Sequence, residues 1–328
     1  MRPDDINAFF QAAAIGEGLD LVEAAAAGFA EFDLRNVLSG WDNIKIVFRG
    51  QRNASWGLTS SLARAVRNGD HEDLSEFELG AAERRILAGA RDRDSVTGAR
   101  SWLGLNLTDG ELLAVLQHQE APTRFIDVTD DARVALYFAS DSEDTVDGRL
   151  FVIAIRDENP TPTTNALHPQ GSRLALDGQE SLPWPIVKTS KYGPGEWTNS
   201  LYYVDAGRLD PRMSAQRGLF IVGGLPKSYA HFPLPPIPAA DLSSVMSVGL
   251  GFRASLRHIT KINQYASAYA WSIRVPADSK PSIRNRLKNE HQIHHDSLFP
   301  EYREFKRLAQ RLAVPPPDPP GTDDLGTA

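Results

Sequence analysis

The sequence contains no cysteine among its 328 residues. Disulfide bonds, thiolate metal ligands and a cysteine nucleophile are therefore excluded, together with the enzyme classes that depend on them. A chain without cysteine suits a reducing compartment, so we expect the protein to be cytoplasmic.

Long apolar runs are absent as well. A membrane-spanning helix needs about 20 consecutive apolar residues, and no run in this sequence approaches that length. The chain opens on Met1-Arg2-Pro3-Asp4-Asp5, whereas a signal peptide begins with a basic and then an apolar segment. We therefore expect neither a membrane partner nor export.

Positive charge is in the minority, since 35 Lys and Arg residues face 42 Asp and Glu residues and the net charge is −7. This balance argues against broad affinity for nucleic acid, although a local basic face can still bind phosphate. Charge alone therefore names no partner.

The residues that are present, 41% hydrophobic and 23% charged, are typical of a soluble globular protein with a full core. Helices are predicted within residues 4–38, 71–92, 109–119 and 130–140, and two more within 279–312, broken before Pro300. Strands are predicted at 44–48, 124–128, 149–155, 201–204, 219–222, 244–248 and 268–275. Because regular βαβ spacing is missing, we predict an α+β fold with a mixed central sheet and N-terminal, central and C-terminal helices.

The first predicted strand delivers an arginine. Ile44, Ile46 and Phe48 alternate with residues of the other face, so Arg49 should lie opposite Phe48 at the strand end. Gly50 then lets another backbone or a ligand approach, and the planar guanidinium is suited to clamp an anion. The alternative is a structural ion pair with a carboxylate.

Residues 116–139, LQHQEAPTRFIDVTDDARVALYFA, place uncommon polar residues between two apolar runs. A histidine can carry protons near neutral pH, and Asp127 can orient His118 or accept a hydrogen bond from a ligand hydroxyl. The alternative is a buried polar brace in which these groups satisfy one another. Arg124 either joins Arg49 at a diphosphate or pairs with Asp127. The polar residues of this segment that we expect to converge with Arg49 are Gln117, His118, Thr123, Arg124 and Asp127.

Two later segments add to the candidate site. Gln216 precedes an apolar strand, where its amide can hydrogen-bond a ribose or base or simply pair with strand backbone. Residues 157–199 are rich in proline and glycine with little periodicity, and we expect them to cover the cleft, with Trp184, Tyr192 and Trp197 able to stack on a base.

These islands together resemble the FRG-domain family of bacterial proteins. The resemblance rests on Phe48-Arg49-Gly50, Gln117-His118, Pro122-Thr123-Arg124, Asp127, Thr129 and the run Ala135-Leu136-Tyr137-Phe138-Ala139, and more weakly on residues 212–220 and 298–300. It implies an N-terminal helical segment at 1–40, an FRG-like α+β domain at 41–312 and a disordered proline-rich tail at 313–328.

The order of elements is also similar to that of ADP-ribosyltransferases, which bind NAD as a substrate. If that layout transfers, Arg49 contacts the ribose-phosphate side, while Thr129 and Tyr137 line the nicotinamide pocket. Gln216 then stands where those enzymes have a glutamate. A glutamine can hydrogen-bond a ribose hydroxyl but gives no negative charge to an oxocarbenium-like state.

Other ligand signals are weak. Gly249-Leu250-Gly251 lacks the third glycine of a dinucleotide fingerprint and a surrounding βαβ unit. His291, His294 and His295 have helical spacing, but an exposed histidine cluster explains them without zinc. We therefore expect no metal and no tightly bound cofactor.

Three functions remain. The first is a cytoplasmic bacterial enzyme, in defence or toxicity, that cleaves NAD or transfers its ADP-ribose with His118, Asp127 and Gln216 in the chemistry. The second is a non-catalytic module that binds a nucleotide, a nucleic-acid end or a partner protein. The third, metal-dependent hydrolysis by His118 and Asp127, lacks a third ligand.

Overall fold

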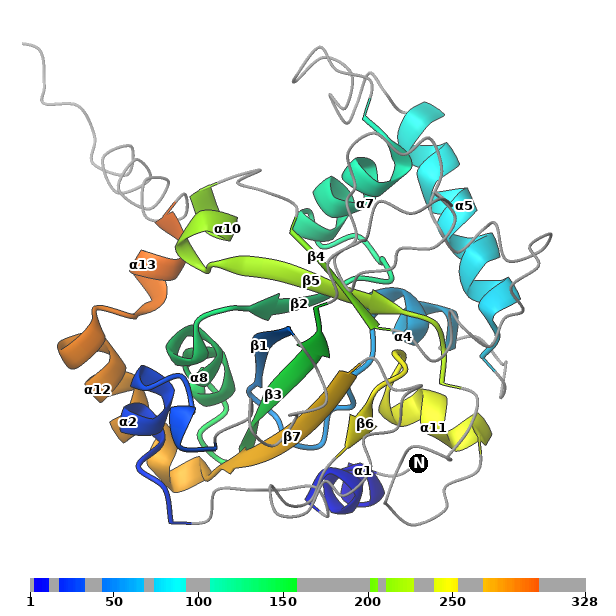
Figure 1. Cartoon of the computed structure of the whole chain (residues 1–328). Helices are drawn as coiled ribbons and strands as arrows, with labels where there is room; N and C mark the ends of the chain where they lie inside the picture. Colours follow the sequence, from blue (N-terminus) through cyan, green and yellow to red (C-terminus); the bar gives the residue numbers. More distant parts are fainter. Residues whose placement is uncertain are drawn as a thin grey trace, which may run out of the picture.

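A computed structural model describes residues 3–11, 18–32, 43–67, 74–92, 107–157, 201–205, 211–226, 239–252 and 268–300. Within these ranges seven strands form one sheet in the order β4-β5-β2-β1-β3-β7-β6 (Figure 1). The strands are β1 Ile44–Gln51, β2 Ile126–Thr129, β3 Gly148–Arg156, β4 Leu201–Val204, β5 Gly218–Gly223, β6 Gly251–Phe252 and β7 Ala268–Val275. All neighbours pair antiparallel except β6 and β7, which are parallel, so the sheet is mixed as predicted.

Helices surround this sheet and confirm the α+β class (Figure 1). Their bounds are α1 Pro3–Gln11, α2 Leu21–Ala26, α4 Ser61–Arg67, α5 Glu76–Asp92, α7 Asp109–His118, α8 Ala132–Ser140, α10 Pro211–Ala215, α11 Ala239–Val245, α12 Lys280–His291 and α13 His295–Leu298, with 3₁₀ turns at Ala30–Phe32 and Ala277–Ser279. No helix in the described ranges has the length and apolar character needed to cross a bilayer.

The two faces of the sheet carry separate hydrophobic cores, because side chains alternate along each strand. Phe48, Val152 and Trp271 face the core that α2, α8 and α12 cover. Val47 and Phe151 face the other core, which α1 and α11 cover. A third core lies between α5, α7 and the β4–β5 end of the sheet. Both termini of the described chain thus pack onto the sheet.

The glycine of the Phe48-Arg49-Gly50 triplet is explained by helix packing. A Cβ placed on Gly50 would lie 1.8 Å from the carbonyl oxygen of Ala135 and 2.6 Å from the amide nitrogen of Ala139. A Cβ placed on Gly148, on the neighbouring strand, would lie 1.9 Å from the carbonyl oxygen of Ala139. The absence of side chains at these glycines lets α8 lie directly on β1 and β3, so the group that approaches Gly50 is a helix backbone.

The main differences from the predicted elements are local. Residues 244–248 were expected as a strand, but α11 extends to Val245 and only Met246 forms a bridge, with Leu58. That prediction was wrong because the whole run is nearly buried, and a short apolar run without alternation fits either element. The break in the C-terminal helices falls at Gln292, which adopts a left-handed conformation with φ 59°, ahead of Pro300.

The predicted cover at 157–199 lies outside the described residues from residue 158 onwards, and so does the predicted tail at 313–328. The predicted domain boundaries at 40 and 312 stay predictions, although strands from residue 44 to residue 275 share the single sheet.

Candidate ligand-binding site

The candidate site begins where two central strands separate. β1 and β3 pair along their whole length, but the described residues of β1 and β2 pair at Phe48 and Thr129 alone. The positions that would pair next, Arg49 with Val128 and Gly50 with Asp127, are not joined. The Arg49 side chain occupies this fork, where its Nη1 donates a hydrogen bond to the main-chain carbonyl of Asp127.

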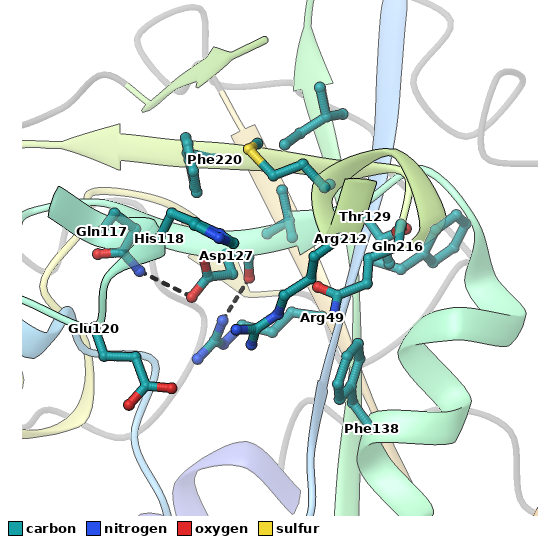
Figure 2. Close-up of a pocket in the computed structure, with 16 residues that line it drawn as sticks. Arg49, Gln117, His118, Glu120, Asp127, Thr129, Phe138, Arg212, Gln216 and Phe220 are labelled. Atoms are coloured by element: carbon teal, nitrogen blue, oxygen red, sulfur yellow. Dashed lines mark hydrogen bonds between the residues drawn. The ribbon is translucent and has the colours of Figure 1, made fainter. Parts of the chain in front are cut away.

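The fork opens into a cavity of about 320 Å³. Figure 2 shows Gln117, His118 and Asp127 on one side of it and Thr129 and Gln216 on the other, with Arg49 and Arg212 between them. The side chains come from β1, the end of α7, β2, α8, α10 and β5, so three strands and three helices contribute to the cavity. The full lining is Phe48, Arg49, Gly50, Gln117, His118, Glu120, Asp127, Val128, Thr129, Phe138, Arg212, Met213, Gln216, Gly218, Leu219 and Phe220.

Positive charge in the cavity is incompletely compensated. Arg49 forms no ion pair within the described part of the chain, and its Nε is buried without a hydrogen-bond acceptor. Burial lowers the pKa of Arg49, the Asp127 carboxylate opposes that shift, and the nearby Arg64 adds to it. Arg212 stacks over the ring of Phe299 at 4.8 Å and likewise has no carboxylate partner among the described residues. Two guanidinium groups thus keep free donors towards one cavity.

The Asp127 carboxylate is held by a chain of hydrogen bonds. Thr123 Oγ1 donates to Gln117 Oε1, and Gln117 Nε2 donates to Asp127 Oδ2 at 2.9 Å. Thr123 itself is fully buried and ties the chain to α4, because its amide donates to Ser61 Oγ at 3.0 Å. Asp127 therefore points into the cavity with one oxygen occupied.

The opposite wall is built around Gln216. Thr129 Oγ1 donates to the carbonyl of Gln216 at 2.7 Å, which joins β2 to the end of α10. The side-chain amide of Gln216 donates from Nε2 to the carbonyl of Leu298 at 3.1 Å. Gln216 therefore connects the cavity to α13 through its amino group, while its side chain still lines the space.

Six of the nine predicted site residues line the cavity, and three do not. Thr123 lies behind Gln117. Arg124 is buried and forms ion pairs with Glu76 at 2.7 Å and Glu83 at 3.4 Å, so neither expected role, beside Arg49 or with Asp127, fits its position. Tyr137 packs into the core under α8, and burial raises its pKa to about 12. The six that line the cavity are Arg49, Gln117, His118, Asp127, Thr129 and Gln216.

Sequence reasoning missed several residues of the wall. Arg212 was seen as part of a motif but not as a charge of the site, since only the fold brings α10 to β1. Glu120 follows the glutamine-histidine pair with φ 62°, which turns the chain at the cavity rim. Phe138 and Phe220 looked like ordinary core positions. Of these residues, only Arg212 had a usable signal in the sequence, because it lies in the segment 212–220 that takes part in the family resemblance.

No group of three or more His, Asp or Glu side chains suited to a metal ion occurs among the described residues. His294 is the N-cap of α13, and His295 packs edge-on against the Phe299 ring at 4.8 Å between ring centroids. The cavity therefore offers cationic donors, two carboxylates, a histidine and aromatic walls.

Comparison with known proteins gives one match. Residues 44–148 match the model of the FRG domain, and this segment includes β1, α7, β2 and α8. No curated protein and no solved structure matches the chain.

Proposed function

Because the chain contains an FRG domain whose matched residues build most of this cavity, we propose that the cavity binds a phosphorylated nucleotide of the NAD class. The observation that carries the proposal is the state of Arg49. A buried guanidinium normally pairs with a carboxylate or fills its donors with acceptors, because burying an unpaired charge is costly. Arg49 is half-buried and donates from Nη1 to a neutral carbonyl, while its Nε is buried without an acceptor and its side chain lines the cavity.

An anion would relieve this arrangement. Arg49 and Arg212 line the same space with no carboxylate bound to either, and a planar guanidinium binds phosphate oxygens through two parallel hydrogen bonds. Two carboxylates line the cavity: Asp127 accepts a hydrogen bond from Gln117, and Glu120 forms no ion pair with either arginine among the described residues. A phosphate therefore fits between the two arginines better than a neutral ligand does.

The walls and the size fit the rest of a nucleotide. Phe48, Phe138 and Phe220 provide aromatic surface, on which a base or sugar can pack. A volume of about 320 Å³ lies at the small end of the range for small-molecule sites, roughly 300–1,000 Å³. It suits one mononucleotide half of a dinucleotide such as NAD.

Transfer or cleavage chemistry is a second candidate. Thr129 and Gln216 line the cavity beside Arg49, and all three are residues to which the resemblance to ADP-ribosyltransferases gives a ligand contact. Tyr137, which that layout also assigns, packs in the core. The side-chain amino group of Gln216 already donates a hydrogen bond to the carbonyl of Leu298, which is a structural contact. We therefore favour the binding function over the transfer chemistry. A role in bacterial defence or toxicity stays a prediction from the family resemblance.

The binding proposal is tested by titration calorimetry of the full chain with NAD⁺ and with AMP. We expect both to bind, and we expect Arg49→Gln to weaken AMP binding by about ten- to a hundredfold, because a charge-assisted contact contributes about 1.5–3 kcal/mol. Arg52→Gln is the matched control. It removes the same charge three residues further on, where Arg52 pairs with Glu143 and lies over Trp56 outside the cavity.

Equal affinity of the Arg49→Gln and Arg52→Gln variants for AMP would contradict the assignment of Arg49. Absence of binding of either nucleotide to the unmodified protein would remove the function altogether. Release of nicotinamide from NAD⁺ is measured on the same samples. Turnover that Gln216→Glu preserves or increases would support transfer chemistry, because the carboxylate stabilises an oxocarbenium-like state.

A further inference from the structure

The Asp127 carboxylate is oriented by hydrogen bonds whose direction is fixed at each step. The amide of Phe125 donates to Thr123 Oγ1 at 3.1 Å, so the hydroxyl hydrogen of Thr123 is free to go to Gln117 Oε1. The Gln117 amino group must then face the other way. It donates to Asp127 Oδ2, and the orientation of the amide is determined by its neighbours.

The second oxygen of Asp127 is left as an acceptor. Within the described chain no donor reaches Oδ1, while an ionised carboxylate can accept on both oxygens. Arg49 lies beside it but binds the main-chain carbonyl of Asp127 and leaves the carboxylate alone. The cavity therefore keeps a cationic donor and an anionic acceptor next to each other without a direct ion pair between them.

The Arg49 guanidinium and the Asp127 carboxylate together restrict which groups of a bound nucleotide can lie against them. A phosphate goes to Arg49 and Arg212, because the Asp127 carboxylate repels it. The ligand group that meets Asp127 must be a hydrogen-bond donor close to that phosphate. In a nucleoside monophosphate the ribose hydroxyls are nearer to the phosphate than the base amino groups are, so a hydroxyl is the donor that fits.

We infer that Asp127 selects ribonucleotides, by accepting a hydrogen bond from the ribose 2′- or 3′-hydroxyl, and that Gln117 is the positioning residue for this contact. The inference rests on the proposed nucleotide binding and adds the substrate class. Asp127 is exposed in the free protein, so a ligand that covers its carboxylate without donating to it takes water from that acceptor and leaves it unpaired. A site built to hydrogen-bond a hydroxyl therefore discriminates against an analogue that lacks it.

The test compares the affinities of the full chain for AMP, 2′-deoxy-AMP and 3′-deoxy-AMP by calorimetry. We expect one of the two deoxy analogues to bind about ten- to a hundredfold more weakly than AMP. In Asp127→Ala this ratio should fall to about one. In Gln117→Leu, which leaves the carboxylate but removes its holding partner, the ratio should lie between those of the other two proteins.

Glu120→Ala is the matched control, because it also removes a carboxylate from the cavity. No described residue holds the Glu120 carboxylate in place. The substitution should change the affinities for all three ligands equally and leave the ratio as in the unmodified protein. Equal binding of AMP and both deoxy analogues would overturn the inference and leave nucleotide binding standing. If Asp127→Ala kept the ratio between the AMP and deoxy-AMP affinities, another residue would be responsible for the discrimination, and the inference would be wrong. Absence of AMP binding to the unmodified protein would overturn both proposals.

Discussion

Gly50 shows how one residue couples the packing of the fold to the candidate site. The residue before it, Arg49, turns into the cavity, and the residue two before it, Phe48, packs in the core. Gly50 itself is in contact with the backbone of α8 at Ala135 and Ala139. The alanines of the run 135–139 serve the same close approach, so the two motifs meet in a single contact.

A side chain at Gly50 should therefore be poorly tolerated. Gly50→Ala places a Cβ 1.8 Å from a helix carbonyl, and neither backbone can give way alone. We expect a loss of at least about 2 kcal/mol in the free energy of unfolding, at the upper part of the range for overpacking. The measurement is urea denaturation followed by circular dichroism.

Gly89→Ala is the comparison for this change. Gly89 is exposed on α5 with nothing within 4 Å of an added Cβ, so the same substitution should stabilise by about 0.5–1 kcal/mol through helix propensity. If both variants unfolded at the same urea concentration, the close contact between β1 and α8 would be refuted.

Among the elements, those with specific local signals were predicted well. Thr108 and Glu111 form a capping box, and α7 begins at Asp109 as predicted. β1, predicted from its period-two alternation, and the apolar strands β3 and β7 were placed within a few residues of their bounds. The end of α11 and the left-handed Gln292 were missed, because burial on both sides removes periodicity and a non-glycine cap leaves no signal.

The site was predictable to the extent that it is local in sequence. Residues 117–129 run from the end of α7 through a short connection into β2, so their convergence followed from the motif, and Arg49 followed from strand alternation. Arg124 sits between Thr123 and Phe125 but turns to α5, because Glu76 and Glu83 are there to receive it. No pattern along the chain encodes that long-range pairing, and Arg212 was overlooked for the same reason.

The beginning of α8 provides a prediction about pH. Burial acts to raise the pKa of Asp131, but hydrogen bonds and charge from Arg133 outweigh it and hold the pKa below the ordinary value of 3.8. The folded state thus favours the ionised carboxylate, and the resulting stability is present above pH 3.8 and lost as the pH falls towards the folded pKa.

Asp131→Asn keeps a good helix cap but removes this charge. We expect a loss of about 1–2 kcal/mol in the free energy of unfolding at pH 7, and a smaller loss at pH 3. Urea titrations at the two pH values measure it. Glu120→Gln, at an exposed position, should show almost no difference at either pH. A loss in Asp131→Asn that did not change with pH would mean that the charge of Asp131 has no part in stability.

For the molecule as a whole, the N-terminal helices belong to the cores of the sheet. α2 packs on the face of α8 and α12, whereas α1 packs on the opposite face with α11. α1 also completes the surroundings of Arg149, a fully buried guanidinium that donates to Ser272 Oγ at 2.6 Å and to Asn7 Oδ1. Burial lowers the pKa of Arg149 to about 10, since no carboxylate pairs with it in the described chain.

Phe10 is the residue through which α1 should stabilise the whole fold. It is fully buried, packs edge-on against Phe151 at 5.0 Å between ring centroids, and lies under the Arg149 guanidinium at 5.3 Å. Phe10→Ala should therefore leave a cavity and remove the aromatic face from a buried cation, at a cost of about 3–5 kcal/mol. Gln11→Ala, exposed on the same helix, should cost almost nothing. Both variants should unfold in one cooperative urea transition if α1 and the sheet form a single folding unit. Equal stability of the two variants would show that α1 does not hold this face of the sheet.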